Sequence, residues 1–426
     1  MNCKELEADI EKLKELKEKI ERFINGLSEI KGDDVLELGA TFREVNGFED
    51  EALNKYSREI IANNPDIFEP SYEIKETIDG FLGYAQSVLE LPDGSFLVGG
   101  GTNGGKGDKL KLLSKENGSF EYGKAIEGFT SNYITQTILL PSGDILVGGT
   151  DDCDRPNESE IRILHKDSNG GFSFGEKIEL EGDESELGLS SMSLLPNGDV
   201  VVGYGNPYDW KKGGQLRILR KDDAGDYKFV ESSIRSTDYA IGALLSLPDG
   251  RIMMAPADGL TPVEIMEETA DDELSVVGSV ENTEDYCGMT LQMLPDGNVL
   301  LGDDSGSVVL LGCSKKDGAE YWGQENDLLV SGDTKALLCL PNNEIIVGGE
   351  KVKRLVYLRH GPDITSLYES GKIENLHALH LKSLSDDTFL AFDRKTTVVH
   401  YDSDYSLDGI KEKLPELSSK KLTDVY

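Results

Sequence analysis

One ten-residue phrase recurs along this chain, and its spacing constrains the fold more than any other feature. It reads LPDGSFLVGG from Leu91 and returns as LPSGDILVGG, LPNGDVVVGY, LPDGRIMMAP, LPDGNVLLGD and LPNNEIIVGG. A weaker seventh copy, LSDDTFLAFD, begins at Leu384. Successive copies start between 44 and 55 residues apart. A regular period in this range predicts a stacked or closed repeat architecture.

Each phrase has the chemistry of a β-hairpin. Apolar residues lead into Pro-Asp-Gly or Pro-Asn-Gly, where proline presets φ and glycine accepts the positive φ that follows. A strand rich in Val, Ile and Leu then leads away. A second hairpin completes the repeat: its first strand is of the type LKLL or IRIL, and its last strand carries aromatic residues. Each repeat therefore predicts four short antiparallel strands, which is typical of a propeller blade.

The chain is thus expected to be mainly β, with a seven-bladed β-propeller of four-stranded antiparallel blades over residues 70–412 and a small α-helical region before it. This pattern resembles the WD-repeat and kelch-like propellers, although the Gly-His and Trp-Asp marks of WD repeats and the kelch double glycine are absent. An open β-solenoid is the structural alternative, but its coils are usually shorter than about 49 residues.

A closed propeller must join its last blade to its first. Ile78 precedes Pro92 by 14 residues, much as Ile126 precedes Pro141 by 15. The segment from Tyr72 to Ile78 is therefore expected to be the outer strand of the seventh blade, paired with the segment from Thr397 to Tyr401. The segment from Tyr405 to Ile410 is the alternative for the same place.

The first seventy residues have a different pattern. Residues 1–31 carry apolar side chains at steps of three and four, which predicts an amphipathic, coiled-coil-like helix. It spans about three heptads, enough for weak dimerisation or for packing on its own neighbours. Residues 32–69 resemble one tetratricopeptide-type helical hairpin, through Leu38-Gly39-Ala40, Phe42, Ala52-Leu53, Tyr56 and Pro65. Residues 413–426 are expected to be a C-terminal tail.

The net charge of −37, from 80 acidic and 43 basic residues, argues against nucleic acid or an anionic membrane as a partner. It is compatible with a basic protein or peptide. The five cysteines are scattered and form no CxxC motif, which favours reduced thiols and a cytoplasmic location. No signal peptide and no membrane span are expected from the apolar runs.

Motifs for cofactors and metals are weak, and we expect none to be bound. The stretch from Gly100 to Lys106 has the spacing of a phosphate-binding loop, but Gly107 replaces the Ser or Thr and a strand follows instead of a helix. The acidic run of residues 151–160 lacks the ligand placement of an EF-hand. Among the histidines His165, His360, His377, His380 and His400, only His377 and His380 are near each other, and on a predicted strand they would point to opposite faces.

The loops before the innermost strands carry the candidate binding site. In a propeller these loops surround one mouth of the central channel, and tyrosine favours interfaces because it offers amphipathic contact area at low entropic cost. A long insertion in the third repeat would project over the same face. The candidate partner-binding residues are Tyr84, Tyr133, Tyr208, Trp210, Asp238, Tyr239, Asp285, Tyr286, Asp333 and His377. The alternative is that these aromatic side chains pack between the blades.

These observations favour a non-enzymatic interaction scaffold, an acidic propeller that presents a mouth rich in Tyr and Asp to a protein or peptide. The alternative is a small-ligand-binding or hydrolase/lyase-type propeller that uses carboxylates in the channel. Paired carboxylates with raised pKa values in one pocket would distinguish it. A sialidase-type enzyme is suggested by the polar turns, but the Arg-Ile-Pro signature of that group is absent.

Overall fold

The computed structural model describes residues 71–402, apart from 103–106, 152–158, 169, 180–186, 206–212, 296, 317–318, 330–332, 341–343, 350–351, 361–362, 374–375 and 385–387. The predicted helices of residues 1–31 and 32–69, the alternative closing segment and the C-terminal tail lie outside the described residues. The chain divides into two compact units, and the larger comprises residues 72–357 and 366–401. The larger unit is described below.

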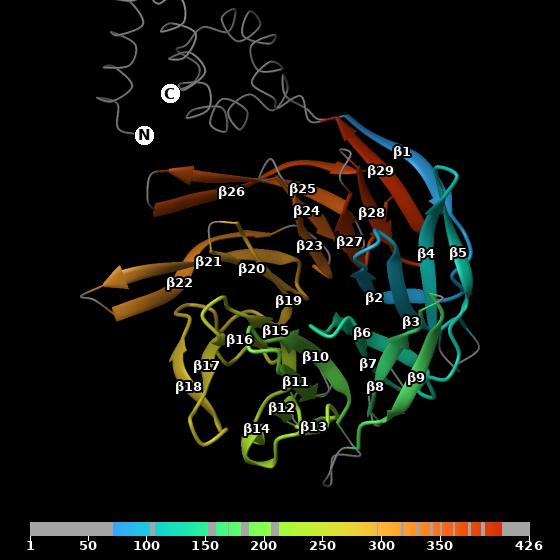
Figure 1. Ribbon diagram of the computed structural model, residues 1–426. Coiled ribbons are helices and arrows are strands. Elements are labelled where there is room, and N and C mark those ends of the chain that lie inside the picture. Colours follow the sequence, from blue (N-terminus) through green and yellow to red (C-terminus); the bar gives the residue numbers. More distant parts are fainter. Residues whose placement is uncertain are drawn as a thin grey trace, which may run out of the picture. The chain divides into compact units, whose positions relative to one another are not determined.

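The described strands follow one another in antiparallel groups of four (Figure 1). The first two groups are β2 (Tyr84–Glu90), β3 (Phe96–Gly101), β4 (Leu110–Glu116) and β5 (Ser119–Ala125), then β6 (Tyr133–Leu139), β7 (Ile145–Thr150), β8 (Ser159–Lys166) and β9 (Phe172–Lys177). A single residue pair between β3 and β6, Gly101 with Tyr133, links these groups into one sheet. The third group is β10 (Leu189–Leu194), β11 (Val200–Gly205), β12 (Gly214–Lys221) and β13 (Tyr227–Phe229), with β14 (Arg235–Thr237) also pairing β12.

The remaining groups repeat the same order. They are β15 (Ile241–Ser246), β16 (Ile252–Pro256), β17 (Glu264–Glu268) and β18 (Leu274–Ser279); β19 (Gly288–Met293), β20 (Val299–Asp303), β21 (Ser307–Lys316) and β22 (Ala319–Leu329); and β23 (Ala336–Cys339), β24 (Glu344–Gly348), β25 (Val352–His360) and β26 (Asp363–Ile373). The last group combines β27 (His380–Ser383), β28 (Thr388–Phe392) and β29 (Thr396–Asp402) with β1 (Ser71–Ile78).

The repeated phrase forms the same tight turn in successive groups, which confirms the hairpin prediction. In the first group, Leu91 N donates to Ser95 O at 2.8 Å and Gly94 N donates to Leu91 O at 2.9 Å. Gly94 has φ of 79°, a value that side chains disfavour. The glycines at the end of the phrase are required for a different reason. A Cβ at Gly100 would lie 1.9 Å from Tyr84 O on the neighbouring strand, so a side chain there would clash with backbone.

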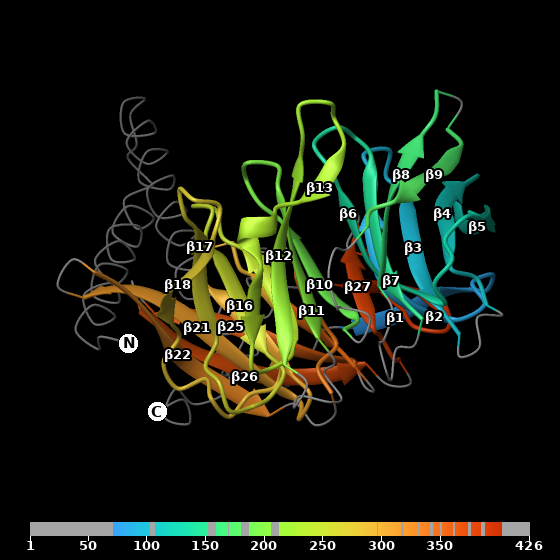
Figure 2. The same cartoon turned by 90° about the horizontal axis from the view of Figure 1, so that it is seen from below.

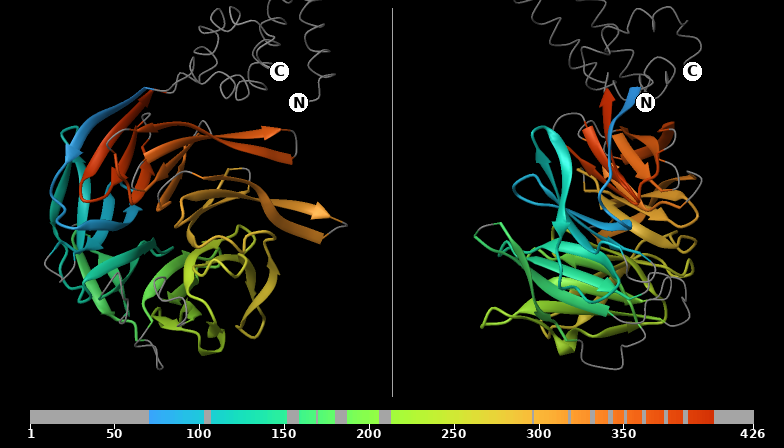
Figure 3. Two further views of the ribbon diagram at one scale, coloured as in Figure 1. Left: turned by 180° about the vertical axis from the view of Figure 1, so that it is seen from behind. Right: turned by 90° about the vertical axis from the view of Figure 1, so that its right-hand side faces the viewer.

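The first strands of the groups, which we call the inner strands, are β2, β6, β10, β15, β19, β23 and β27. Each inner strand contacts the next, and β27 contacts β2, so the described part of the chain forms a closed circuit. Figure 3 shows the successive groups from behind. Apolar side chains fill the spaces between neighbouring groups. Phe96 of β3 and Phe392 of β28, for example, are fully buried with ring centroids 6.3 Å apart.

The last group is closed by the strand from the beginning of the described chain. The sheet order is β1-β29-β28-β27, which confirms the prediction that residues 72–78 supply its outer strand. Polar contacts strengthen this junction. Tyr122 and Thr396 hydroxyls lie 2.6 Å apart, and Lys395 Nζ lies 3.1 Å from Asp79 Oδ1. Among the described residues, no helix is long and apolar enough to cross a membrane.

Candidate functional site

Carboxylates hold the loops that precede the first two inner strands. Asp108 Oδ2 accepts a hydrogen bond from Leu82 N at 2.7 Å. Glu160, 1% exposed, accepts from Thr130 N at 2.9 Å and from Ser131 N at 2.6 Å. Burial alone would raise the pKa of Glu160, but these hydrogen bonds together with Arg162 lower it overall. These hydrogen bonds position the loops just before Tyr84 and Tyr133.

Three predicted mouth tyrosines are used in packing. Tyr133 is 2% exposed and pairs with both Gly101 and Thr150. Tyr286 packs against the apolar core between the fourth and fifth groups. Burial, together with a hydrogen bond to Glu264, raises the pKa of the Tyr239 hydroxyl. These three side chains hold neighbouring groups together.

The other predicted mouth residues are more accessible. Tyr84 is 36% exposed and lies beneath Arg394. Asp238, Asp285 and His377 are exposed. His377 precedes β27, so the expectation that it shares a strand with His380 is wrong. Asp333 Oδ2 pairs with Lys335 Nζ at 3.1 Å.

Tyr208 and Trp210 lie outside the described residues. The binding role of the predicted residues stays a prediction.

Two adjacent carboxylates, Asp303 and Asp304, lie at the end of β20. Burial first, and then neighbouring Asp304, raise the pKa of Asp303, which is 1% exposed. Its side chain accepts from Ser305 Oγ at 2.7 Å and from Ser307 N at 2.5 Å, which fixes the turn between β20 and β21. Asp303 thus has a structural role in the turn. No group of described residues could hold a metal ion.

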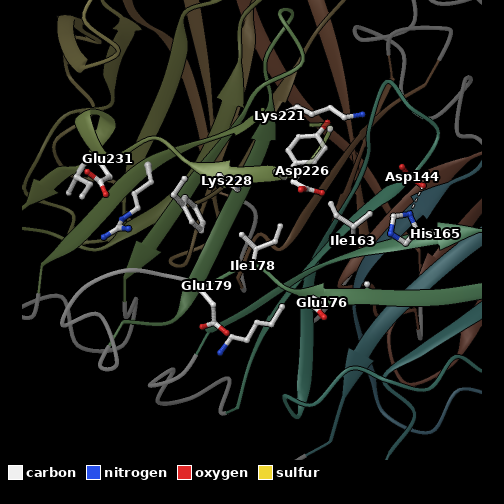
Figure 4. A pocket seen from close by; sticks show the side chains of 17 residues that line it. Asp144, Ile163, His165, Glu176, Ile178, Glu179, Lys221, Asp226, Lys228 and Glu231 are labelled. Carbon is white, nitrogen blue, oxygen red and sulfur yellow. Dashed lines mark hydrogen bonds and ion pairs between the residues drawn. The ribbon is translucent and has the colours of Figure 1, made fainter. Parts of the chain in front are cut away.

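A groove of about 1160 Å³ lies between the second and third groups. Its walls come from β8, β9, β12 and β13, whose hairpins project at the same end of the larger unit (Figure 2). Ile163 and Ile178 are apolar side chains of its lining (Figure 4), and Tyr227 and Phe229 contribute aromatic rings to it. The groove therefore combines apolar and aromatic surface with charged side chains of both signs.

A histidine–aspartate pair lies at one end of this groove (Figure 4). His165 Nδ1 is 2.9 Å from Asp144 Oδ1, and both side chains line the groove. When Nδ1–H donates to the carboxylate, the tautomer is fixed and the lone pair of Nε2 is available. Nε2 lies over Gly175, where a Cβ would approach it to 3.2 Å. The absence of a side chain at residue 175 therefore keeps the imidazole accessible.

The same register position carries a structural ion pair in the next group. Arg220 Nε is 2.8 Å from Asp199 Oδ2, and the partners are 21 positions apart in sequence, as are Asp144 and His165. Arg220 also binds Asp272 at 2.8 Å and Glu268, both on the fourth group. His165 differs because, among the described contacts, its only side-chain partner is Asp144 and 52% of its side chain is exposed. His165 therefore occupies the same cross-strand position as Arg220, but its imidazole is partly exposed and lines the groove.

Charges of both signs surround the groove. Lys177, Lys221 and Lys228 alternate with Glu176, Glu179, Asp226 and Glu231. Arg217 is 3% exposed, its Nε donates to Gln215 Oε1 at 2.7 Å, and its guanidinium carbon lies 5.7 Å from the Phe229 ring centroid. Burial first, then Asp144 and Asp199, raise the pKa of Tyr227, so this hydroxyl stays protonated at neutral pH. The groove offers donors and acceptors around aromatic faces.

The sequence did not suggest this site, because His165 stands alone in its neighbourhood of the chain. The information was present in the hairpin register. Ile145 pairs with Leu164, so the residues just outside that pair, Asp144 and His165, must lie opposite each other.

The comparisons with known proteins identify the fold. No family model matches the chain, and no curated protein matches it. Solved structures do: the WD40 β-propeller domain of Doa1 has 13% identity and a TM-score of 0.52 over 79% of this chain and 99% of that chain. The periplasmic gluconolactonase PpgL of Pseudomonas aeruginosa has 12% identity and a TM-score of 0.53, and the match covers 68% of this chain and 85% of that chain. A putative 6-phosphogluconolactonase from Bacteroides fragilis has 12% identity and a TM-score of 0.54, and the match covers 71% of this chain and 87% of that chain.

The fold is that of a β-propeller. The comparisons also correct the functional expectation. We expected a non-enzymatic scaffold, but one structural neighbour is named a gluconolactonase and another a putative 6-phosphogluconolactonase, and lactonases are hydrolases. The prediction of a protein without enzymatic activity from this repeat pattern is therefore wrong, because the same architecture also occurs in enzymes.

Proposed function

We propose that this chain is a seven-bladed β-propeller hydrolase that opens the ring ester of a small hydroxylated lactone. The observation that carries the proposal is the His165–Asp144 pair, 2.9 Å apart at the end of a groove of about 1160 Å³. A histidine oriented by a carboxylate is a suitable general base when its other nitrogen faces the substrate.

Closure of the ring supports the architectural part of the proposal. The inner strands contact one another in a circuit that returns from β27 to β2, and β1 completes the last group. A closed ring of seven blades would hold the second and third groups at a fixed separation. The groove between them would then be preorganised, which lowers the cost of binding.

In the proposed reaction a water molecule in the groove gives a proton to His165 Nε2 as its oxygen attacks the lactone carbonyl carbon. Asp144 stabilises the imidazolium that forms, because its carboxylate accepts the hydrogen bond from Nδ1. The ring C–O bond then breaks, and the imidazolium returns the proton to the departing alkoxide. The product is one hydroxy acid, so lactone and water are fully accounted for.

The walls of the groove support a hydroxylated substrate. Lysine donors and carboxylate acceptors alternate around Tyr227 and Phe229, and sugar-like molecules present the complementary pattern of hydroxyl groups and C–H faces. Two structural neighbours carry names of enzymes that act on lactones of sugar acids. A neutral lactone is also compatible with a protein of net charge −37, which would repel an anion at long range.

The proposal is tested with purified full-length protein and a panel of neutral sugar-acid lactones, glucono-δ-lactone first. Hydrolysis is followed by proton release at constant pH, above the spontaneous rate. We expect His165→Gln to lower kcat by about 10²-fold or more, and Asp144→Asn to lower it by a similar factor.

His377→Gln is the matched control, because His377 is exposed and belongs to another group of strands. It should retain full activity. Wild-type protein that hydrolyses none of the panel, or His165→Gln that retains wild-type kcat, would overturn the proposal. Circular dichroism of each variant separates loss of the site from loss of the fold.

A further inference from the structure

The outer strand of the fourth group, β18, differs from the outer strands of the other groups because it carries no charge. The sheet order ends at β18, and within the described part of the chain no strand pairs with its other edge (Figure 1). The outer strands β1, β5, β9, β13, β22 and β26 each contain at least one Lys, Asp or Glu, whereas β18 reads LSVVGS. Charged side chains, lysine above all, keep an exposed sheet edge from pairing with another chain. This protection is missing at β18.

Two adjacent valines of β18 are exposed. Met266 of β17 is opposite Val276. The preceding residue of β17, Ile265, is opposite Gly278, so Val277 is an extra residue that forms a bulge. The bulge interrupts the alternation of side chains along the strand, and Val276 and Val277 are 37% and 47% exposed. This edge therefore offers a partner both backbone hydrogen bonds and apolar contact.

The fourth group and the beginning of the fifth carry acidic side chains only. Residues 252–314 contain 13 Asp and Glu and no Lys, Arg or His. Asp271 and Glu273 precede β18 directly and are exposed. Glu284 and Asp285, which follow β18, are exposed too. The uncharged strand is thus bounded by negative charge at both ends.

These flanking charges decide which kind of strand fits the edge. Antiparallel pairing with a second copy of β18 would bring Glu273 of one copy near Glu281 of the other, and parallel pairing would bring identical acidic residues together. Like charges opposite each other destabilise strand pairs. A strand that carries Lys or Arg at both ends meets opposite charges instead. Charge complementarity therefore favours a basic partner over a second copy of this chain.

We propose that the outer edge of β18 binds an extended segment of another protein that is uncharged in the middle and carries Lys or Arg at both ends. The segment adds one strand to the fourth group. Its backbone supplies affinity, Val276 and Val277 contact its apolar side chains, and the acidic residues select its basic ends. Arg220 shows the same preference within the chain, because it extends from the third group to Glu268 and Asp272.

This surface is independent of the proposed lactone site. The groove is lined by residues of the second and third groups and by none of β18. A partner on β18 would therefore leave the groove open, and the two proposals can fail separately.

The test uses full-length protein and the synthetic peptide KKTVTVTKK, labelled with fluorescein and followed by fluorescence anisotropy. We expect a Kd below about 1 mM, the range of weak contacts. The peptide EETVTVTEE should bind at least about tenfold more weakly, because its ends meet like charges. The peptide KKTVPVTKK should lose affinity by a similar factor, since proline removes a backbone donor from its centre.

A lysine on β18 is the decisive change. Val277→Lys gives this strand the charge that the other outer strands carry, and it should weaken binding of KKTVTVTKK at least about tenfold. Glu121→Lys is the matched control, because Glu121 is exposed on the outer strand β5. It should retain wild-type affinity. Asp271→Asn combined with Glu273→Gln should weaken binding and reduce its salt dependence. Circular dichroism checks the fold of each variant, and lactone hydrolysis should not change.

Amide hydrogen exchange shows where the peptide binds. Residues 275–279 should exchange more slowly in its presence, and those of β5 should not change. Equal affinity of Val277→Lys and wild type, protection outside β18, or no binding of KKTVTVTKK would overturn the proposal. So would a wild-type dimer in sedimentation that Val277→Lys dissociates, because the occupant would then be a second copy of this chain.

Discussion

The Arg394 guanidinium lies over the ring of Tyr84, with its central carbon 4.5 Å from the ring centroid, and it also donates to the Tyr84 hydroxyl. Arg394 belongs to the turn between β28 and β29, whereas Tyr84 begins β2. The contact therefore joins the last group of strands to the first, beside the junction that β1 completes.

Arg394→Ala should weaken this junction. A cation over an exposed aromatic ring contributes about 1 kcal/mol, and we expect the free energy of unfolding in urea to fall by that amount. Lys228→Ala is the control, because Lys228 pairs with Asp222 within one hairpin at 2.6 Å. If both variants lose equal stability, the contact has no special role in closing the ring.

Arg220→Ala should destabilise the protein most at neutral pH. It leaves Asp199, Glu268 and Asp272 close together without a cation, at an expected cost of about 2 kcal/mol. Burial already raises the pKa of Glu268, and loss of the Arg220 cation raises it further, so Glu268 takes up a proton as the pH falls and the deficit shrinks.

Urea unfolding at pH 7.5 and at pH 4.5 measures this dependence. Arg220→Lys should recover only part of the loss, because an ammonium cannot reproduce the fork of the guanidinium. A deficit that is the same at both pH values would contradict the electrostatic explanation.

Gly242→Ala should disrupt the packing between two inner strands. A Cβ at residue 242 of β15 would lie 1.8 Å from Gly288 O of β19, and backbone on both sides leaves no room for adjustment. We expect a loss of about 3 kcal/mol or a failure to fold. Gly123→Ala is the matched control, since its Cβ would meet only Leu112 O at 3.6 Å. Thermal unfolding of both variants distinguishes the close approach from a general effect of replacing glycine.

Cys287 should be slow to react with iodoacetamide at pH 8. Burial first, and then Asp304, Asp303 and Asp258, raise the pKa of its thiol to about 11, so little thiolate is present. The alkylation rate should increase about tenfold per pH unit from pH 8 to pH 10. Asp304→Asn should increase the rate at pH 8, measured by mass spectrometry of the modified peptide. A rate that is independent of pH in this range would show that access, and not ionisation, limits the reaction.

Local chemistry explains why much of the fold was predictable. The turn at Pro92-Asp93-Gly94 depends on residues adjacent in sequence, and so does each of its repeats. The closing strand was predictable for a related reason, because the distance from Ile78 to Pro92 repeats that from Ile126 to Pro141. Both predictions depend only on the chain's own periodicity.

The site depends on contacts between groups, which the periodicity does not contain. Tyr84 and Tyr133 each lie eight residues before the proline of their repeat, yet the first is 36% exposed and the second 2%. Their surroundings differ because only Tyr133 pairs across to the preceding group, at Gly101. The sequence analysis missed His165 for the same reason. Its proposed role depends on its cross-strand partner Asp144 and on a groove to which a neighbouring group contributes.

The pairing of β1 with β29 also has a consequence for biosynthesis. β1 ends at Ile78, while its partner begins only at Thr396. At about 5–20 residues per second, the ribosome needs tens of seconds to deliver that partner. Throughout this time β1 presents a strand edge that other nascent chains could capture. The yield of folded protein should therefore depend on translation speed, and chaperones that cover the unpaired β1 should increase it.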